Sequence, residues 1–191
     1  KPADAITLQN AATVEMSVLR RSLITGLAAS AQRNIFRGAT AVKLFEIDRT
    51  FATVPGTYML GGIVGGALQR VAWRGGEQKT DFFTLKGELE DLFEQLGVRD
   101  VAFVPTLKAP LVEGHAAQIK IGDDVIGAVG ELDTSLIKID RQPYKLYVFE
   151  INLAMLESDF ALAITYQPVN KLPASTRDLA IVVAKKEPYA D

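Results

Sequence analysis

Two long strand patterns joined by a turn, at residues 42–51 and 58–69, constrain the fold of this chain more than any other feature. In the first, VKLFEIDRTF, side chains alternate with a period of two, so Lys43, Phe45 and Ile47 share one face of a strand. The second, YMLGGIVGGALQ, contains four glycines, and a Val-Pro-Gly turn signal separates the two patterns. Glycine weakens a strand, so we expect it here because a helix packs closely on the sheet.

The other elements are helices and hairpin strands. Asp81 is the predicted N-cap of a helix that ends at Gly97 and buries a leucine stripe. The hairpins indicate an α+β domain, a mainly antiparallel sheet with helices packed on it. The stripe is Leu85, Leu89, Leu92 and Leu96; the further predicted elements are a helix at 22–36 capped by Ser22, strands at 101–104, 117–121, 125–129, 145–153 and 179–184, and short helices at 133–139 and 153–158.

Composition excludes several classes of function. The chain has 191 residues, of which 48% are hydrophobic and 23% charged, as expected for a globular protein with a core. The net charge of −2 provides no overall field for nucleic acid or anionic lipid, so a basic site would have to be a local patch. The absence of cysteine excludes disulfides, thiolate nucleophiles and cysteine-based zinc sites. No apolar run reaches the length that spans a bilayer.

Four arginines lie within or just after the stretch LRRSLITGLAASAQRN at residues 19–34. Arg20 and Arg21 lie at the start of the predicted helix, and Arg33 and Arg37 lie at its end. A guanidinium group binds two oxygens of a phosphate or carboxylate, so one interpretation is a site for phosphate or an acidic substrate. A solvated helix next to basic loops is the alternative interpretation.

Other candidate chemistry has less support. His115 is the only histidine, and it lies in a predicted glycine-flanked loop without further metal ligands nearby in sequence or a G-x-S-x-G motif. The glycine pairs match no phosphate-binding fingerprint. Glu46, Asp48 and Glu150 lie in strand patterns, where a paired-carboxylate site and water-exposed sheet faces are both open. We therefore assign no catalytic, cofactor-binding or metal-ligating residue and interpret the chain as a scaffold.

A series of short motifs covers nearly the whole chain in a distinctive order. They are LQN at 8–10, SVLRRSL at 17–23, LFEIDRTF at 44–51, DFFTLKG at 81–87, GHAA at 114–117, IGAVGEL at 126–132, YVFE at 147–150 and PVNKLPASTRDL at 168–179. Together they resemble the β subunit of bacterial phenylalanyl-tRNA synthetase. The departures are small: Thr25 stands where this family commonly has proline, and His115 stands where arginine is usual.

The resemblance implies a core similar to a class II synthetase catalytic domain at residues 1–165. Residues 166–191 would be a linker and the truncated start of a ferredoxin-like anticodon-binding domain. The implied partner is the α subunit, which holds the ATP and phenylalanine site in a cytoplasmic (αβ)₂ assembly that binds tRNA(Phe) and no membrane. ATP and magnesium would belong to the full enzyme, with no cofactor in this chain. Because the chain opens at Lys1 and stops at Asp191 after a strand-like run, we expect a piece of a longer polypeptide.

The resemblance also predicts that this chain alone is inactive. An active class II core has an anion-binding arginine where this sequence has Ala52, and another in its third motif, where residues 127–134 have none. We therefore expect a non-catalytic structural and interaction module that supports the α subunit. The alternatives are an RNA-binding module and a class II-like core that binds ATP or an amino acid on its own.

The four arginines are then the candidate contacts to a partner subunit or to RNA phosphate. Arg20 and Arg21 are expected to anchor the start of the helix through carboxylates of neighbouring strands or of the partner subunit. A contact between these arginines and tRNA phosphate is the alternative.

Overall fold

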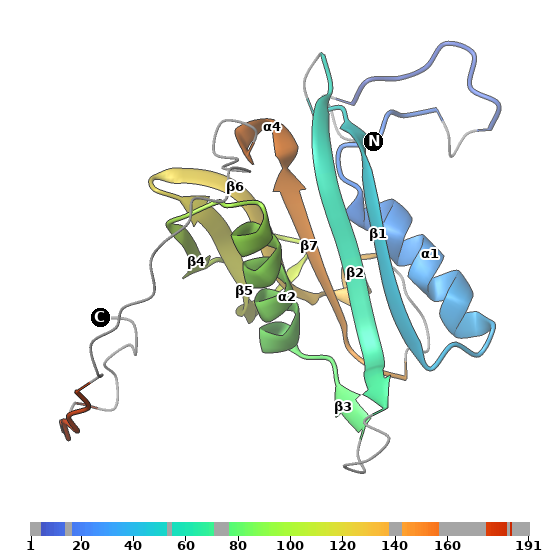
Figure 1. The fold of residues 1–191 in the computed structure, drawn as a ribbon. Coiled ribbons are helices and arrows are strands. Elements are labelled where there is room, and N and C mark those ends of the chain that lie inside the picture. Colours follow the sequence, from blue (N-terminus) through green and yellow to red (C-terminus); the bar gives the residue numbers. More distant parts are fainter. Residues whose placement is uncertain are drawn as a thin grey trace.

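The structure, a computed structural model, describes residues 5–13, 17–52, 55–70, 77–137, 143–156, 175–182 and 184. In this part of the chain an antiparallel sheet carries helix α1 on one face and helix α2 on the other (Figure 1). The helices are α1 (Ile24–Phe36), α2 (Phe82–Gln95), α3 (Thr134–Ile137) and α4 (Leu153–Leu156). The strands are β1 (Ala41–Thr50), β2 (Thr57–Arg70), β3 (Glu77–Lys79), β4 (Val101–Pro105), β5 (Leu111–Ile121), β6 (Asp124–Leu132) and β7 (Leu146–Asn152).

The sheet has the strand order β1-β2-β7-β6-β5-β4, and β3 pairs with β2 beside this path. β1 and β2 form the predicted hairpin, with an uninterrupted register from Ala41 opposite Gly66 to Thr50 opposite Thr57. Strand β7 comes late in the chain but lies between β2 and β6, so it joins the two halves of the sheet. The predicted α+β class with a mainly antiparallel sheet is confirmed.

Helix α1 starts one residue later than predicted, because Leu23 and not Ser22 is its N-cap residue. The Ser22 hydroxyl still accepts a hydrogen bond from the Ile24 N–H at 3.1 Å. Leu23, Leu27 and Ala31 are buried, as their helical spacing predicts. The other buried residues of this cluster are Ile24, Ala28, Val42, Ile63, Leu132, Leu146 and Val148.

Helix α2 agrees closely with its prediction. Asp81 is the N-cap, and its carboxylate accepts a hydrogen bond from the Thr84 N–H at 2.7 Å. Leu85, Leu89 and Phe93 are buried on the sheet, whereas the predicted stripe residues Leu92 and Leu96 are partly buried at its margin. Within the described residues, neither this helix nor any other has the length and apolar character needed to cross a membrane.

Two neighbouring glycines of β2 make close contacts, one on each face of the sheet, and of these only Gly61 packs against a helix as predicted. A Cβ atom at Gly61 would lie 3.0 Å from the Cβ of Leu23, which α1 presses onto the sheet. A Cβ atom at Gly62 would lie 2.2 Å from the ring of Phe149 on β7. A side chain at Gly62 would overlap the Phe149 ring, and one at Gly61 would crowd Leu23, so glycine allows the close approach on both faces.

Some predicted boundaries were wrong. β5 begins at Leu111 and not at residue 117, and its register shifts between Leu111 and Ala116, which interrupts the regular alternation from which strands are predicted. The short strand β3 was missed. The final strand predicted at 179–184 is not formed in its described residues, and the side chains of Leu179, Ile181 and Val182 are exposed. A strand needs a neighbour for its backbone groups, and no pairing of these described residues occurs.

Two predictions fall partly or wholly outside the described residues. The short helices expected at 133–139 and 153–158 are described only as α3 and α4, and their predicted ends lie beyond the described ranges. Most of the linker expected from residue 166 also lies outside, as does the division of the chain at residue 165.

Leu89→Ala should lower the free energy of unfolding by about 2–5 kcal/mol, since it empties a leucine site in the densely packed core. Leu89 lies on the buried face of α2 and is 2% exposed, whereas Leu107 is 76% exposed and provides a matched control. The measurement is urea unfolding of both variants. A cost for Leu89→Ala as small as that of Leu107→Ala would show that α2 does not cover the sheet.

Candidate interaction site at the start of helix α1

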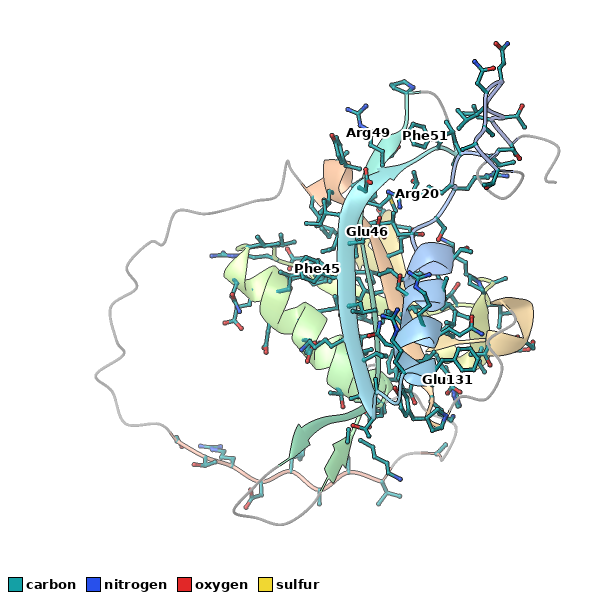
Figure 2. The ribbon with its side chains drawn as sticks, turned by 90° about the vertical axis from the view of Figure 1, so that its right-hand side faces the viewer. Arg20, Phe45, Glu46, Arg49, Phe51 and Glu131 are labelled. Carbon is teal, nitrogen blue, oxygen red and sulfur yellow. The ribbon has the colours of Figure 1, made fainter. Side chains whose placement is uncertain are left out.

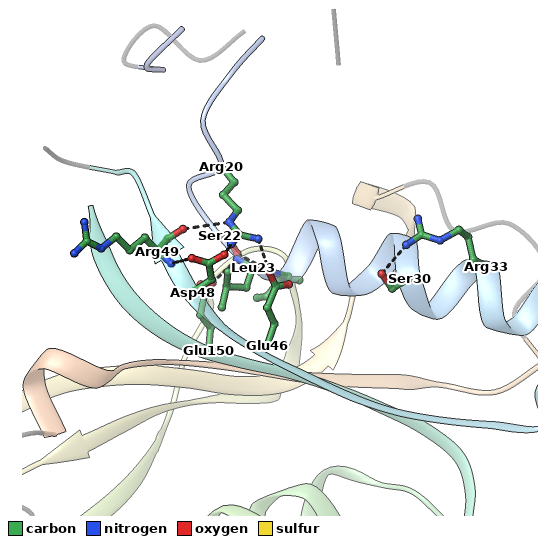
Figure 3. Close-up of polar contacts among 10 residues, drawn as sticks. Arg20, Ser22, Leu23, Ser30, Arg33, Glu46, Asp48, Arg49 and Glu150 are labelled. Atoms are coloured by element: carbon green, nitrogen blue, oxygen red, sulfur yellow. Dashed lines mark hydrogen bonds and ion pairs between the residues drawn. The ribbon is translucent and has the colours of Figure 1, made fainter. Parts of the chain in front are cut away.

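Arg20 lies just before α1, and its guanidinium group is bound on three sides by strand β1 (Figure 3). Its Nε donates to the carbonyl oxygen of Arg49 at 3.1 Å, and one terminal nitrogen donates to Glu46 Oε1 at 2.5 Å. The other terminal nitrogen donates to the carboxylate of Asp48. Glu46 and Asp48 are two residues apart on β1, so both carboxylates project from one face and match the two ends of the arginine fork.

The backbone of the same residue is tied to the same strand. The carbonyl oxygen of Arg20 accepts a hydrogen bond from the N–H of Phe51 at 2.7 Å, directly after β1. On the outer side of this segment, the guanidinium group of Arg49 lies 4.6 Å from the centre of the Tyr58 ring. The side chain and backbone of Arg20 thus fix the position at which the chain enters α1.

The first turn of α1 contains no acidic residue, and its N-cap Leu23 has no capping side chain. Instead, Glu150 of β7 accepts a hydrogen bond from the Leu23 N–H at 2.6 Å. The positive end of a helix favours a carboxylate at this point, and it satisfies a backbone donor that the helix leaves free. The sheet therefore adds a carboxylate cap to the one that the Ser22 hydroxyl provides.

The strand register explains how the sheet accommodates both the helix and its carboxylates. Glu46 on β1 lies opposite Gly61 on β2, and Gly61 lies opposite Glu150 on β7. These three residues form a row across the face that α1 covers, with the glycine in the middle. Leu23, which is fully buried, packs over Gly61 between the two glutamates.

The four predicted arginines do not converge on one site. Arg20 is bound internally, and the Arg21 side chain next to it is exposed. At the far end of α1, Arg33 donates to the Ser30 hydroxyl at 2.8 Å, and Arg37 is exposed just after the helix. A helix of 13 residues is about 20 Å long, so the two pairs are well separated. Anchoring by Arg20 through carboxylates of a neighbouring strand is confirmed; contacts of any of the four with a partner or RNA stay predictions.

The sequence left two interpretations of Glu46, Asp48 and Glu150 open, a paired-carboxylate site and water-exposed sheet faces. The structure gives these three carboxylates a different role. Glu46 and Asp48 hold Arg20, and Glu150 binds the Leu23 N–H, so all three converge on the start of α1. The contact made by Glu150 joins residues 127 positions apart in the chain. Nothing in the local sequence around Glu150 could have indicated it.

A second charged cluster lies well away from Arg20 (Figure 2). Glu131 of β6 accepts from His115 Nδ1 and from Lys145 Nζ, each 2.7 Å from the same carboxylate oxygen. His115 belongs to β5, so its predicted place in a loop was wrong. Burial opposes ionisation of Glu131, but the hydrogen bonds from Lys145 and His115 outweigh it and lower the pKa of this carboxyl group. Among the described residues, no group of three or more His, Cys, Asp or Glu side chains could hold a metal ion.

Taken together, an antiparallel sheet with a helix fixed to each face defines an α+β domain whose charged groups at α1 serve its own architecture. Residues 1–153 match the family model described as "Phenylalanyl tRNA synthetase beta chain CLM domain", and the chain belongs to this family. The resemblance seen in the sequence motifs is thereby confirmed.

Curated relatives agree with this family. The chain is 35% identical over 97% of its length to the phenylalanine–tRNA ligase beta subunit of Moorella thermoacetica. It is 31% identical over 94% to that of Fusobacterium nucleatum and 33% identical over 90% to that of Bacillus subtilis. The chain covers 24%, 24% and 22% of these relatives, so it spans about a quarter of their length.

Arg20→Met should lower the free energy of unfolding by about 1–3 kcal/mol, because it removes charge-assisted hydrogen bonds and leaves two neighbouring carboxylates without their cation. The matched control is Arg21→Met, which removes an exposed arginine one position away. Urea unfolding measures both. Equal, small effects of the two substitutions would contradict an anchoring role for Arg20.

The lowered pKa of Glu131 predicts a pH dependence of stability. The ionised carboxylate is favoured in the folded chain, so its contribution is fully present above the ordinary pKa of 4.5 and is lost as pH falls through the lower folded value. Glu131→Gln should therefore destabilise the chain at neutral pH. It should also reduce the loss of stability that occurs below pH 4.5. Unfolding measured as a function of pH should show no such flattening for Glu113→Gln, which changes an exposed glutamate of β5.

Proposed function

We propose that this chain is a non-catalytic structural and interaction module of a phenylalanyl-tRNA synthetase β subunit. It supports the α subunit during aminoacylation of tRNA(Phe), within an (αβ)₂ assembly in the cytoplasm. The observation that carries this proposal is the family match over residues 1–153, together with relatives named as beta subunits of phenylalanine–tRNA ligase. The antiparallel sheet supports the further proposal that this module resembles a class II synthetase core.

Three features favour a non-catalytic role. Ala52 follows β1 at the position where the resemblance places an arginine that binds the anionic groups of the substrates. The run at residues 127–134 likewise contains no arginine. In addition, the guanidinium group of Arg20 is already bound by two carboxylates and a carbonyl oxygen. ATP and magnesium are therefore proposed to bind elsewhere in the full enzyme.

The outer strand of the sheet supports an interaction role. β1 is an edge strand, and Phe45 projects from it with 74% of its surface exposed (Figure 2). Ile47, two residues further along the same strand, is 56% exposed. Tyr58 and Arg49 lie next to each other at the end of the same hairpin. Exposed aromatic and arginine side chains on an open sheet edge are typical of a protein interface. We therefore propose that the α subunit covers this edge.

The test is co-expression of the chain with the α subunit from the same genome. We expect a stable complex on size-exclusion chromatography, and we expect Phe45→Asp to weaken it by about tenfold or more, as for an aromatic residue central to an interface. Phe83→Asp is the matched control, since Phe83 is also 74% exposed but lies on α2. Failure of the wild-type chain to bind the α subunit would overturn the proposal, and equal effects of both variants would overturn the assigned edge.

The isolated chain should not catalyse phenylalanine-dependent pyrophosphate exchange, because it lacks the anion-binding arginines. Clear activity of the pure chain would favour the alternative of a self-sufficient class II-like core. If the chain instead binds RNA through its arginines, its affinity should fall steeply with salt as phosphate contacts release counterions.

A further inference from the structure

Strand β1 leaves one side of its backbone open at the edge of the sheet. It stands first in the strand order, and no described strand lies beyond it. Figure 2 looks onto this edge, with α1 on one side of β1 and α2 on the other. The strand has 10 residues and pairs with β2 without a register shift, so its backbone is regular enough to accept a further strand.

The end of this edge is closed by the chain itself, and the contacts there show which way the backbone points. The Arg20 carbonyl oxygen accepts from the Phe51 N–H at 2.7 Å, and Arg20 Nε donates to the Arg49 carbonyl oxygen at 3.1 Å. The Arg49 N–H donates to the Asp48 carboxylate at 2.6 Å. None of these partners belongs to β2, so residues 49 and 51 direct their backbone groups away from the sheet.

Three further residues of β1 have the same orientation. In an antiparallel ladder the N–H and C=O of one residue point to the same side, and that side alternates from residue to residue. Because residues 49 and 51 point outward, Lys43, Phe45 and Ile47 also point outward. These backbone groups have no partner among the described residues, and each residue offers one donor and one acceptor to a strand placed alongside.

The side chains of this edge indicate what such a strand carries. Phe45 and Ile47 are 74% and 56% exposed, so apolar side chains opposite them would remove apolar surface from water. The charge of Lys43 does not protect the edge from pairing, because Glu88 of α2 binds it at 2.6 Å. The exposed guanidinium group of Arg49 binds none of the carboxylates drawn in Figure 3, so it can receive a carboxylate from outside.

The opposite edge of the sheet is built differently. β4 has only 5 residues and ends at Pro105. The Thr106 N–H donates to Ala116 of β5, so the alternation directs residue 105 outward, where proline has no N–H to offer. Short strands and prolines protect an edge from pairing. Of these two edges, only β1 therefore has the features of an acceptor.

We propose that a strand of the α subunit pairs with residues 43–47 of β1 and extends the sheet. Its side chains place apolar groups against Phe45 and Ile47 and a carboxylate beside Arg49. The inference rests on the proposed function, which assigns this edge to the α subunit, and it adds the mode of binding and the chemistry of the partner segment. In such strand addition, backbone hydrogen bonds provide affinity and alternate side chains provide specificity. A partner that covered the edge with side chains alone would bury the outward N–H and C=O groups without satisfying them.

Hydrogen exchange resolved to single amides tests the backbone pairing directly. In the free chain, the N–H groups of Phe45 and Ile47 should exchange faster than those of Leu44 and Glu46, which the alternation directs toward β2. In the complex with the α subunit, exchange at Phe45 and Ile47 should slow by about tenfold or more, because new hydrogen bonds protect these amides. Exchange at Leu44 and Glu46 should change little.

Two variants of one residue separate backbone pairing from side-chain packing. Ile47→Pro and Ile47→Ala both remove the isoleucine side chain, but only proline also removes the N–H. Since this N–H does not bind β2, both variants should keep the fold, which thermal unfolding checks. Ile47→Pro should bind the α subunit about tenfold or more weakly than Ile47→Ala, because a carbonyl group of the added strand then lacks its donor.

A matched pair of arginine variants tests the carboxylate. Arg49→Gln should weaken binding to the α subunit and reduce the dependence of binding on salt. Arg99→Gln removes another exposed arginine, between α2 and β4, and should do neither.

The outcomes distinguish this inference from the proposed function. If the wild-type chain does not bind the α subunit, both fail. If it binds but the amides of Phe45 and Ile47 stay unprotected, or the two Ile47 variants bind equally, strand addition is wrong and the proposed function stands. Equal effects of Arg49→Gln and Arg99→Gln would overturn the assigned carboxylate.

Discussion

The fixed start of helix α1 is the constraint on which one half of the structure depends. Arg20 ties this point to β1 through two carboxylates and two backbone contacts, and Glu150 ties it to β7. Apart from the Ser22 hydroxyl, which accepts from the Ile24 N–H, the first turn of the helix is held by the sheet on which it packs. Helix and sheet are therefore stabilised by the same contacts, and neither the helix position nor the orientation of β1 can change alone.

Strand β7 connects this anchor to the rest of the domain, because its residues alternate between the two faces. Val148 and Glu150 face α1, whereas Tyr147 and Phe149 belong to the core beneath α2. The neighbouring strand β2 has a glycine on each face, Gly61 under Leu23 and Gly62 under Phe149. A single central pair of strands thus sets how closely both layers of the domain approach the sheet.

The features that could be predicted from sequence are those that local patterns determine. The α2 helix follows from the Asp81 cap and its leucine spacing, and the β1–β2 hairpin follows from alternation and a turn. The register shift in β5 hid the strand that contains His115. The capping role of Glu150 and the cluster around Glu131 arise from contacts between distant segments, and a single sequence carries no pattern for these. The family, by contrast, was evident from motifs because each is short and their order is distinctive.

Both charged clusters are held by contacts within the chain, and this decides how a concentration of charge in the sequence should be interpreted. The guanidinium group of Arg20 has partners at Nε and at both terminal nitrogens, all of them from β1. An external anion there would lie next to two carboxylates that the sheet already holds in place. At Glu131, one carboxylate oxygen accepts from both Lys145 and His115, so this cluster is also bound within the chain. A concentration of arginines in the sequence therefore does not by itself mark a binding site, because it does not show which of the cations are already held by the chain's own carboxylates.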